Sequence, residues 1–239
     1  MSAVGGRPLR RVGHKGADLI APGNTLASFD AALACGVDMI EFDVLAERGT
    51  GRLILAHDYR AAARGTPPTL EEGLEHLRSV GYRGVELDVD LKLPGYEERV
   101  VEALRAFGLV ERSLVSSQYR ESLALVRRLE PRLPLGWSVP RVRRDYTGNV
   151  WTALPARAAL LGYRRVLPRR AASAVRAGAI DAVMAHWRVV TPGLVRAVRD
   201  AGGDVYAWTV DDPARIRTLS ELGVTGVITN DPRLFGSLD

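Results

Sequence analysis

The stretch RVGHKGADLIAPGNTLASFDAALACGVDMIEFDV, residues 11–44, reads as a strand, a loop, a helix and a second strand. The helical part opens after a threonine and closes on a glycine, which are ordinary start and stop signals. Charged side chains stand where the apolar strands end, with His14 and Lys15 after the first and Glu41 and Asp43 late on the second. This pattern predicts a parallel sheet with a polar site along one edge.

The same alternation continues to the end of the chain. Strand-like runs occur at 10–14, 39–44, 85–91, 113–117, 135–139, 182–187, 205–210 and 226–230, separated by amphipathic helical runs, with an additional short apolar run at 51–58. Eight such alternations predict a single (β/α)8 TIM-barrel domain over residues 1–239, with its active site at the C-terminal ends of the strands. An open doubly wound sheet is the alternative. Its dinucleotide-binding form has no support, because no Gly-x-Gly-x-x-Gly turn follows the first strand.

Composition narrows the class of protein. The chain has 46% hydrophobic and 26% charged residues, which is typical of a soluble globular protein. Its formal net charge of +5 suits an anionic ligand, but dispersed arginines and only 6% aromatic residues argue against nucleic acid. The one cysteine, Cys35, excludes an internal disulfide. Without a secretory signal core or a membrane-length apolar run, the sequence predicts a cytoplasmic protein with no obligate protein partner.

In barrels of this kind, the catalytic groups lie at the C-terminal ends of the strands. Polar residues that are far apart in the sequence are therefore predicted to meet at one rim. The residues expected there are His14, Lys15, Glu41, Asp43, His57, Glu86, Asp88, Asp90, Lys92, Trp208, Asn230 and Asp231.

These residue types suit phosphodiester chemistry. Carboxylates from two neighbouring strands favour Mg²⁺ or Ca²⁺ as a ligand-bound ion. Burying these charges unpaired would cost too much free energy, so a cation or a lysine is expected beside them. Two histidines, His14 and His57, titrate near neutrality and supply an acid and a base. Structural roles remain open as alternatives: Glu41 and Asp43 as carboxylates in structural salt bridges, His57 in a local turn, and Trp208 in barrel packing.

Seven motifs in order resemble the glycerophosphodiester phosphodiesterases. They are GHKGA (13–17), NT (24–25) followed by SFDAAL (28–33), GVDMIEFDV (36–44), LAHD (55–58), VDLK (89–92), AWTVDD (207–212) and GVTGVITNDP (223–232). The resemblance spans nearly the whole chain. It implies a metal-dependent hydrolysis of glycerophosphodiesters to sn-glycerol 3-phosphate and an alcohol, in which a neighbouring glycerol hydroxyl attacks phosphorus.

Carried over by position, the resemblance implies a role for each of eight residues. The metal ligands would be Glu41, Asp43 and Asp90; the acid/base pair His14 and His57; and the phosphate or substrate contacts Lys15, Lys92 and Trp208. The expected cofactor is a divalent cation, Mg²⁺ or Ca²⁺.

Three departures from the family pattern bear on this site. Lys15 replaces an arginine, so a bidentate fork becomes a point charge. Gly23 replaces the glutamate of Glu-Asn-Thr, which removes a carboxylate from the metal's neighbourhood, and Asp90 is one methylene shorter than the usual glutamate. Together they predict altered metal preference or a weaker enzyme.

Two further segments keep other functions open. Residues 58–68 are short where many family members carry an insertion, so the mouth is expected to be open enough for a lysophospholipid. Residues 141–170 hold eight arginines against one acid, which suits weak contact with an anionic membrane surface or simply a solvated basic face. The rival functions are therefore a lysophospholipase D or phospholipase-type phosphodiesterase and a non-catalytic binder of phosphate esters.

Overall fold

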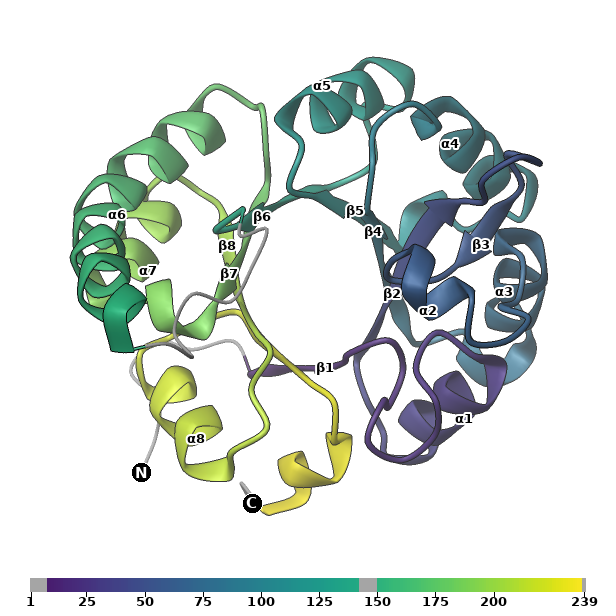
Figure 1. Ribbon diagram of the computed structural model, residues 1–239, viewed down its shortest axis with the longest axis horizontal. Helices are drawn as coiled ribbons and strands as arrows, with labels where there is room; N and C mark the ends of the chain where they lie inside the picture. The colour runs from purple at the N-terminus through teal and green to yellow at the C-terminus, as the bar shows by residue number, and fades with distance from the viewer. Residues whose placement is uncertain (1–7, 142–149, 238–239) are drawn as a thin grey trace.

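The computed structural model describes residues 8–141 and 150–237, and these form a closed barrel of eight parallel strands (Figure 1). The barrel closes because β1 pairs in parallel with both β2 and β9. The predicted fold is therefore confirmed. The barrel strands are β1 (Arg10–Gly13), β2 (Met39–Ala46), β4 (Glu86–Leu91), β5 (Ser113–Ser117), β6 (Leu135–Val139), β7 (Ala182–His186), β8 (Asp204–Trp208) and β9 (Gly226–Thr229).

Helices surround the barrel, and local sequence signals fix where they begin. Thr25 and Thr69 each start a helix with a capping box, while Thr191 and Asp212 cap helices whose first residue is proline. The helices are α1 (Leu26–Ala34), α2 (Tyr59–Ala62), α3 (Leu70–Leu77), α4 (Glu97–Ala106), α5 (Arg120–Leu129), α6 (Val150–Arg176), α7 (Pro192–Asp200) and α8 (Pro213–Glu221), with 3-10 turns η1 (Val80–Tyr82), η2 (Val110–Arg112), η3 (Trp187–Val189) and η4 (Pro232–Ser237).

The alternation of side chains along each strand separates two cores. On β2, Phe42 and Val44 pack against the helices, whereas Met39 points into the barrel and Glu41 follows on the same side. The lower barrel interior is filled by Val12, Met39, Leu114, Ala182, Met184, Tyr206 and Ile228. Apolar side chains thus fill the lower part of the barrel, and polar side chains line the cavity above them. The site is open only at the C-terminal ends of the strands.

The additional short run is not a barrel strand. It forms β3 (Leu53–Leu55), which pairs antiparallel with the end of β2, with Val44 opposite Leu55. Because β3 runs back toward the barrel, the residues after Leu55 return to the rim, and His57 comes with them.

Glu86 does not lie on the rim, so that prediction was wrong. It is the first residue of β4, and its Oε1 accepts a hydrogen bond of 2.8 Å from Arg10, the first residue of β1. Alternation along a strand predicts which face a side chain takes, but the position along the strand decides which end of the barrel it reaches. Glu86 therefore belongs to an ion pair at the floor.

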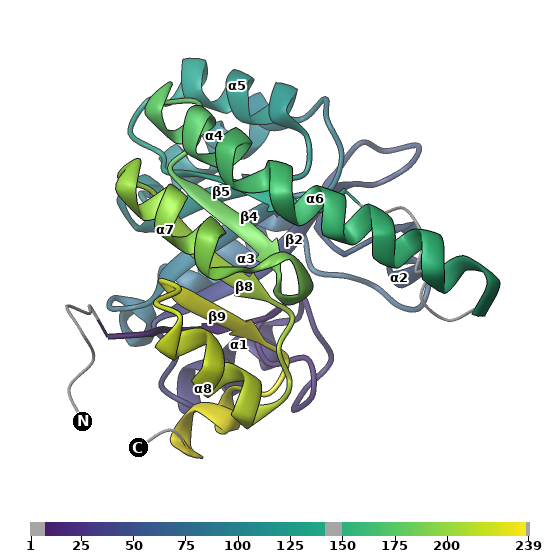
Figure 2. The same ribbon diagram turned by 90° about the vertical axis from the view of Figure 1, so that its left-hand side faces the viewer.

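Helix α6 is 27 residues long and extends past the other helices at the end of the molecule where α2 lies (Figure 2). Of the basic segment 141–170, residues 142–149 and the side chains of 150–158 lie outside the described part of the structure, so its predicted membrane contact stays untested. Among the described residues, no helix combines the length and apolar character that crossing a membrane requires.

Candidate active site

A cavity opens at the C-terminal ends of the strands. Six of the eight predicted site residues line it, while Asp43 is fully buried just behind and Lys15 lies to one side. The lining residues are His14, Glu41, His57, Asp88, Asp90, Lys92, Ser116, Gln118, Ser138, Met184, Trp208, Thr209 and Ile228.

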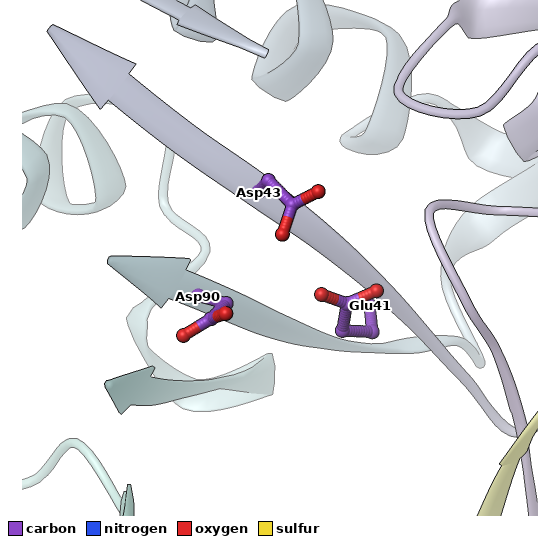
Figure 3. A group of neighbouring side chains, drawn as sticks. All are labelled: Glu41, Asp43 and Asp90. Carbon is purple, nitrogen blue, oxygen red and sulfur yellow. The ribbon is translucent and has the colours of Figure 1, made fainter. Parts of the chain in front are cut away.

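Glu41, Asp43 and Asp90 gather three carboxylates at one point (Figure 3). Asp43 and Asp90 are direct partners in the β2–β4 register, and one oxygen from each of the three residues lies within 4.8 Å of the others. Oδ1 of Asp90 is buried without a hydrogen bond, and Oδ1 of Asp43 is buried with only the ammonium group of Lys92 beside it. Unsatisfied, buried oxygens of this kind fit a hard divalent cation.

Lys92 partly balances this negative charge. Its Nζ lies 2.9 Å from Oδ1 of Asp43 and 2.7 Å from Oδ2 of Asp90. Burial opposes ionisation of Asp43, but the charge of Lys92, the two histidines and the hydrogen bond from Asn24 together outweigh it and hold the pKa of Asp43 below its usual value. The pKa of Glu41, in contrast, is raised well above normal by burial and by the charge of Asp43. One lysine therefore does not neutralise the three carboxylates, and a further cation would be attracted to them.

The loop after β1 holds two of the carboxylates in place. The backbone N–H of Lys15 donates to Oε2 of Glu41 at 2.8 Å, and Nδ2 of Asn24 donates to Oδ2 of Asp43 at 2.8 Å. Lys15 and Asn24 both have positive φ, 51° and 59°, a region that asparagine tolerates better than most residues. The role of Asn24 was not predicted from the sequence, although its residue type was a signal.

Asp18 occupies the space beside Gly23. Its Oδ1 accepts a 2.8 Å hydrogen bond from the Gly23 N–H, and its Oδ2 lies 3.1 Å from Nζ of Lys15. A Cβ at position 23 would lie 2.5 Å from Oδ1 of Asp18. The loop thus keeps a carboxylate next to residue 23 despite the glycine, and the sequence pattern gave no indication of it.

The two predicted catalytic histidines have different surroundings. Nδ1 of His14 lies 2.5 Å from Oδ1 of Asn230, and its Nε2 lies 3.9 Å from Oε2 of Glu41. Burial, reinforced by the charge of Lys15, lowers the pKa of His14 to about 4, so its imidazole is neutral. The His57 side chain is half-exposed, with Nδ1 3.3 Å from Oδ2 of Asp58. The local contact expected of His57 and its place at the cavity are both present.

Asp88 lies one step deeper than Asp90 on the same face of β4. It is 1% exposed, and its Oδ1 has no hydrogen-bond partner. Burial raises the pKa of Asp88 to about 8; a hydrogen bond from Ser116 opposes the rise, and the charge of Asp90 adds to it.

Trp208 serves the barrel and the cavity together. Its Nε1 donates to the Met184 carbonyl at 2.7 Å, while the residue lines the cavity. His186 packs edge-on against it with 5.2 Å between ring centroids, and Nδ1 of His186 accepts from the Arg188 N–H. His186 is not among the residues that line the cavity.

Comparison with known proteins gives one consistent result. The sequence model of the glycerophosphoryl diester phosphodiesterase family matches residues 14–68 and 68–234. A glycerophosphodiester phosphodiesterase of Bacillus altitudinis is 29% identical over 252 residues, covering 92% of this chain and 93% of the relative. One from Caldanaerobacter subterraneus subsp. tengcongensis is 25% identical over 260 residues, covering 95% and 96%.

Solved structures share the fold. A glycerophosphoryl diester phosphodiesterase homologue from Silicibacter pomeroyi aligns with a TM-score of 0.75 at 23% identity, covering 98% of this chain and 95% of that one. A phosphodiesterase of Oleispira antarctica, solved with the product sn-glycerol-3-phosphate, aligns with a TM-score of 0.67 at 22% identity and covers 96% of each chain.

Proposed function

The chain belongs to the glycerophosphoryl diester phosphodiesterase family and is an enzyme of that class, and we propose that it cleaves glycerophosphodiesters to sn-glycerol 3-phosphate and an alcohol. The observation that carries the proposal is the meeting of Glu41, Asp90, Lys92 and two histidines in one cavity at the barrel mouth. The product complex of the Oleispira antarctica enzyme, which has the same fold, supports the substrate class.

Glu41, Asp43 and Asp90 are proposed to hold a Mg²⁺ or Ca²⁺ ion. Such an ion, when bound, neutralises charge on the phosphate oxygens as it develops. The residues fit it because Oδ1 of Asp90 is buried without a partner and one lysine, Lys92, faces three carboxylates.

His14 and His57 are proposed as the acid/base pair. The hydroxyl next to the phosphorylated carbon of glycerol loses its proton to one histidine as its oxygen bonds to phosphorus. The bond from phosphorus to the leaving oxygen breaks, and the other histidine protonates that oxygen. Water then opens the cyclic phosphate with the two roles exchanged, and the balance gives glycerol 3-phosphate and the alcohol.

The remaining contacts are proposed to bind the anionic and organic parts of the substrate. Lys92 lines the cavity and is the proposed phosphate contact. Lys15 supplies a point charge whose direction Asp18 fixes. The ring of Trp208 offers an apolar wall for the glycerol or alcohol, because its N–H is already bonded to the barrel.

A lysophospholipid substrate is the second candidate, and one feature of the rim favours it. Leu19 and Ile20, in the loop after β1, are 61% and 38% exposed. Helix α2, of four residues, is the only helix between β3 and α3. Exposed apolar residues beside an open mouth suit an acyl chain or a lipid surface.

The test is to incubate the full chain with glycerophosphocholine, glycerophosphoethanolamine or a lysophospholipid, each with Mg²⁺, Ca²⁺ or chelator. Released glycerol 3-phosphate, or its acylated counterpart, is measured. We expect metal-dependent release that H14A loses and that H76A keeps, because His76 contacts Asp30 on the outer surface. Release of only the acylated product would favour the lysophospholipid as the substrate. No release above H14A with any substrate would contradict the proposed activity.

A further inference from the structure

A chain of side-chain hydrogen bonds leads from His14 to the outer rim. Nδ1 of His14 is hydrogen-bonded to Oδ1 of Asn230 at 2.5 Å, and Nδ2 of Asn230 donates to Oδ2 of Asp211 at 2.7 Å. Neither Asn230 nor Asp211 lines the cavity, so any effect they have on the reaction passes through His14.

Asp211 determines which way the Asn230 amide faces. Its carboxylate accepts from the Asn230 N–H at 2.8 Å and from the Thr229 hydroxyl at 3.0 Å, besides the contact with the amide. An ionised carboxylate only accepts hydrogen bonds, so Asn230 must turn its NH₂ group toward it. The amide oxygen then faces His14. Because that oxygen only accepts, Nδ1 of His14 must carry the proton.

The barrel frame holds these residues at fixed positions. Gly13 and Thr229 are partners in the β1–β9 register and end their strands, so His14 and Asn230 are the residues that directly follow two neighbouring strands. The His14 N–H donates to the Thr229 carbonyl at 2.8 Å, and the Val210 N–H donates to the Ile228 carbonyl at 3.0 Å. The order of the three side chains is therefore set by the strand ends.

We propose that Asp211 and Asn230 are positioning residues that hold a proton on Nδ1 of His14. Nε2, the nitrogen toward Glu41 and the cavity, then presents its lone pair to the substrate. His14 is accordingly the group that accepts the proton of the attacking hydroxyl, and His57 the one that protonates the leaving oxygen. This assignment rests on the proposed function, whereas the tautomer itself does not.

A purely structural role for Asp211, holding the turn after β8, is the competing explanation. It predicts lower stability in Asp211 variants but leaves the tautomer of His14 unchanged. The two explanations are therefore separated by the protonation of the imidazole nitrogens, which is measured without any substrate.

The experiment uses full-length protein with ¹⁵N-labelled histidine and long-range ¹H–¹⁵N NMR, with His14 assigned by loss of its signals in H14A. Four proteins are compared: wild type, D211N, D211N/N230D and the control D231N. D211N keeps the shape but permits the Asn230 amide to flip. The double variant restores one carboxylate and one amide in the reverse order, so Nδ1 again faces an obligate acceptor. The control makes the same Asp-to-Asn change at Asp231, whose carboxylate pairs with Arg233 instead.

We expect Nδ1–H in wild type and D231N, a mixture of tautomers in D211N, and recovery of Nδ1–H in the double variant. With glycerophosphocholine, kcat of D211N should fall about tenfold to a hundredfold with little change in KM, as for other residues that orient a functional histidine. Nε2–H in the wild type, or unmixed Nδ1–H in D211N, would overturn the proposal even if D211N were less stable. A correct tautomer pattern in a protein that turns over no substrate would refute the proposed function and leave the tautomer lock standing.

Discussion

Asp18 occupies the space that a side chain at Gly23 would need. We expect G23A to lower the free energy of unfolding by about 1–3 kcal/mol, because its Cβ would lie 2.5 Å from Oδ1 of Asp18 and 2.9 Å from Cβ of Lys15. Denaturant unfolding measures this. The matched control is G162A, at an exposed position in α6 where a Cβ meets nothing within 4 Å; it should gain about 0.5–1 kcal/mol. Equal effects at the two positions would argue against a built pocket for Asp18.

Asp88 makes a prediction about pH. Its pKa is about 8 in the fold against an ordinary value of 3.8, so above pH 4 the unfolded chain releases a proton that the folded chain retains. Stability contributed by this proton is full at low pH and is lost as pH rises toward 8. D88N should therefore be more stable than wild type at pH 8, by at least about 1 kcal/mol, since each pKa unit corresponds to about 1.4 kcal/mol.

Unfolding of D88N and wild type in chelator at pH 4 and pH 8 checks the sign. The advantage of the variant should shrink toward pH 4, where Asp88 is protonated in the fold and about 40% protonated in the unfolded chain. An advantage that grew as the pH fell would show that burial does not keep this carboxyl protonated.

Between strand β4 and helix α4, Tyr96 ties the loop that follows Lys92 to the neighbouring strand. Its hydroxyl donates to the Val44 carbonyl at 2.7 Å and accepts from the Leu93 N–H at 3.0 Å, and the residue is 4% exposed. Y96F leaves both groups short of a partner, so we expect a loss of about 1–3 kcal/mol. Chemical unfolding measures it, with Y59F on α2 as a control expected to stay within about 0.5 kcal/mol.

At the level of elements, the positions of strands and helices could be predicted from the sequence, because they depend on local periodicity. The barrel strands lie within one or two residues of their predicted runs, because alternating burial and capping residues are written into each segment. The antiparallel pairing of β3 was not predicted, since a three-residue apolar run carries no sign of its direction. Glu86 was misplaced because alternation alone does not tell one end of a strand from the other.

The site was predictable only as far as motifs and strand ends reach. Glu41, Asp90, His14, His57 and Lys92 all line the cavity as expected. The contact of Asp18 with Gly23 lies within one loop, and that of Asp211 with Asn230 joins two loops. No periodic pattern determines the conformations of these loops. Residues that orient others were therefore missed, although residues at the cavity wall were found.

At the scale of the whole barrel, three carboxylates meet at its open end, and this leads to a last prediction. Glu41, Asp43 and Asp90 face a single lysine, so a cation that binds them stabilises the folded state over the unfolded chain. At a hundred times its Kd, Mg²⁺ or Ca²⁺ should add about 2.7 kcal/mol, which for a chain of this size raises Tm by roughly 5–11 °C. Thermal unfolding with the ion or with chelator measures the shift, independently of activity. D90N should lose most of it, whereas D200N, the same change at the end of α7, should keep it. An equal shift in D90N would place the ion elsewhere, and the absence of any shift at millimolar ion would refute the carboxylate site.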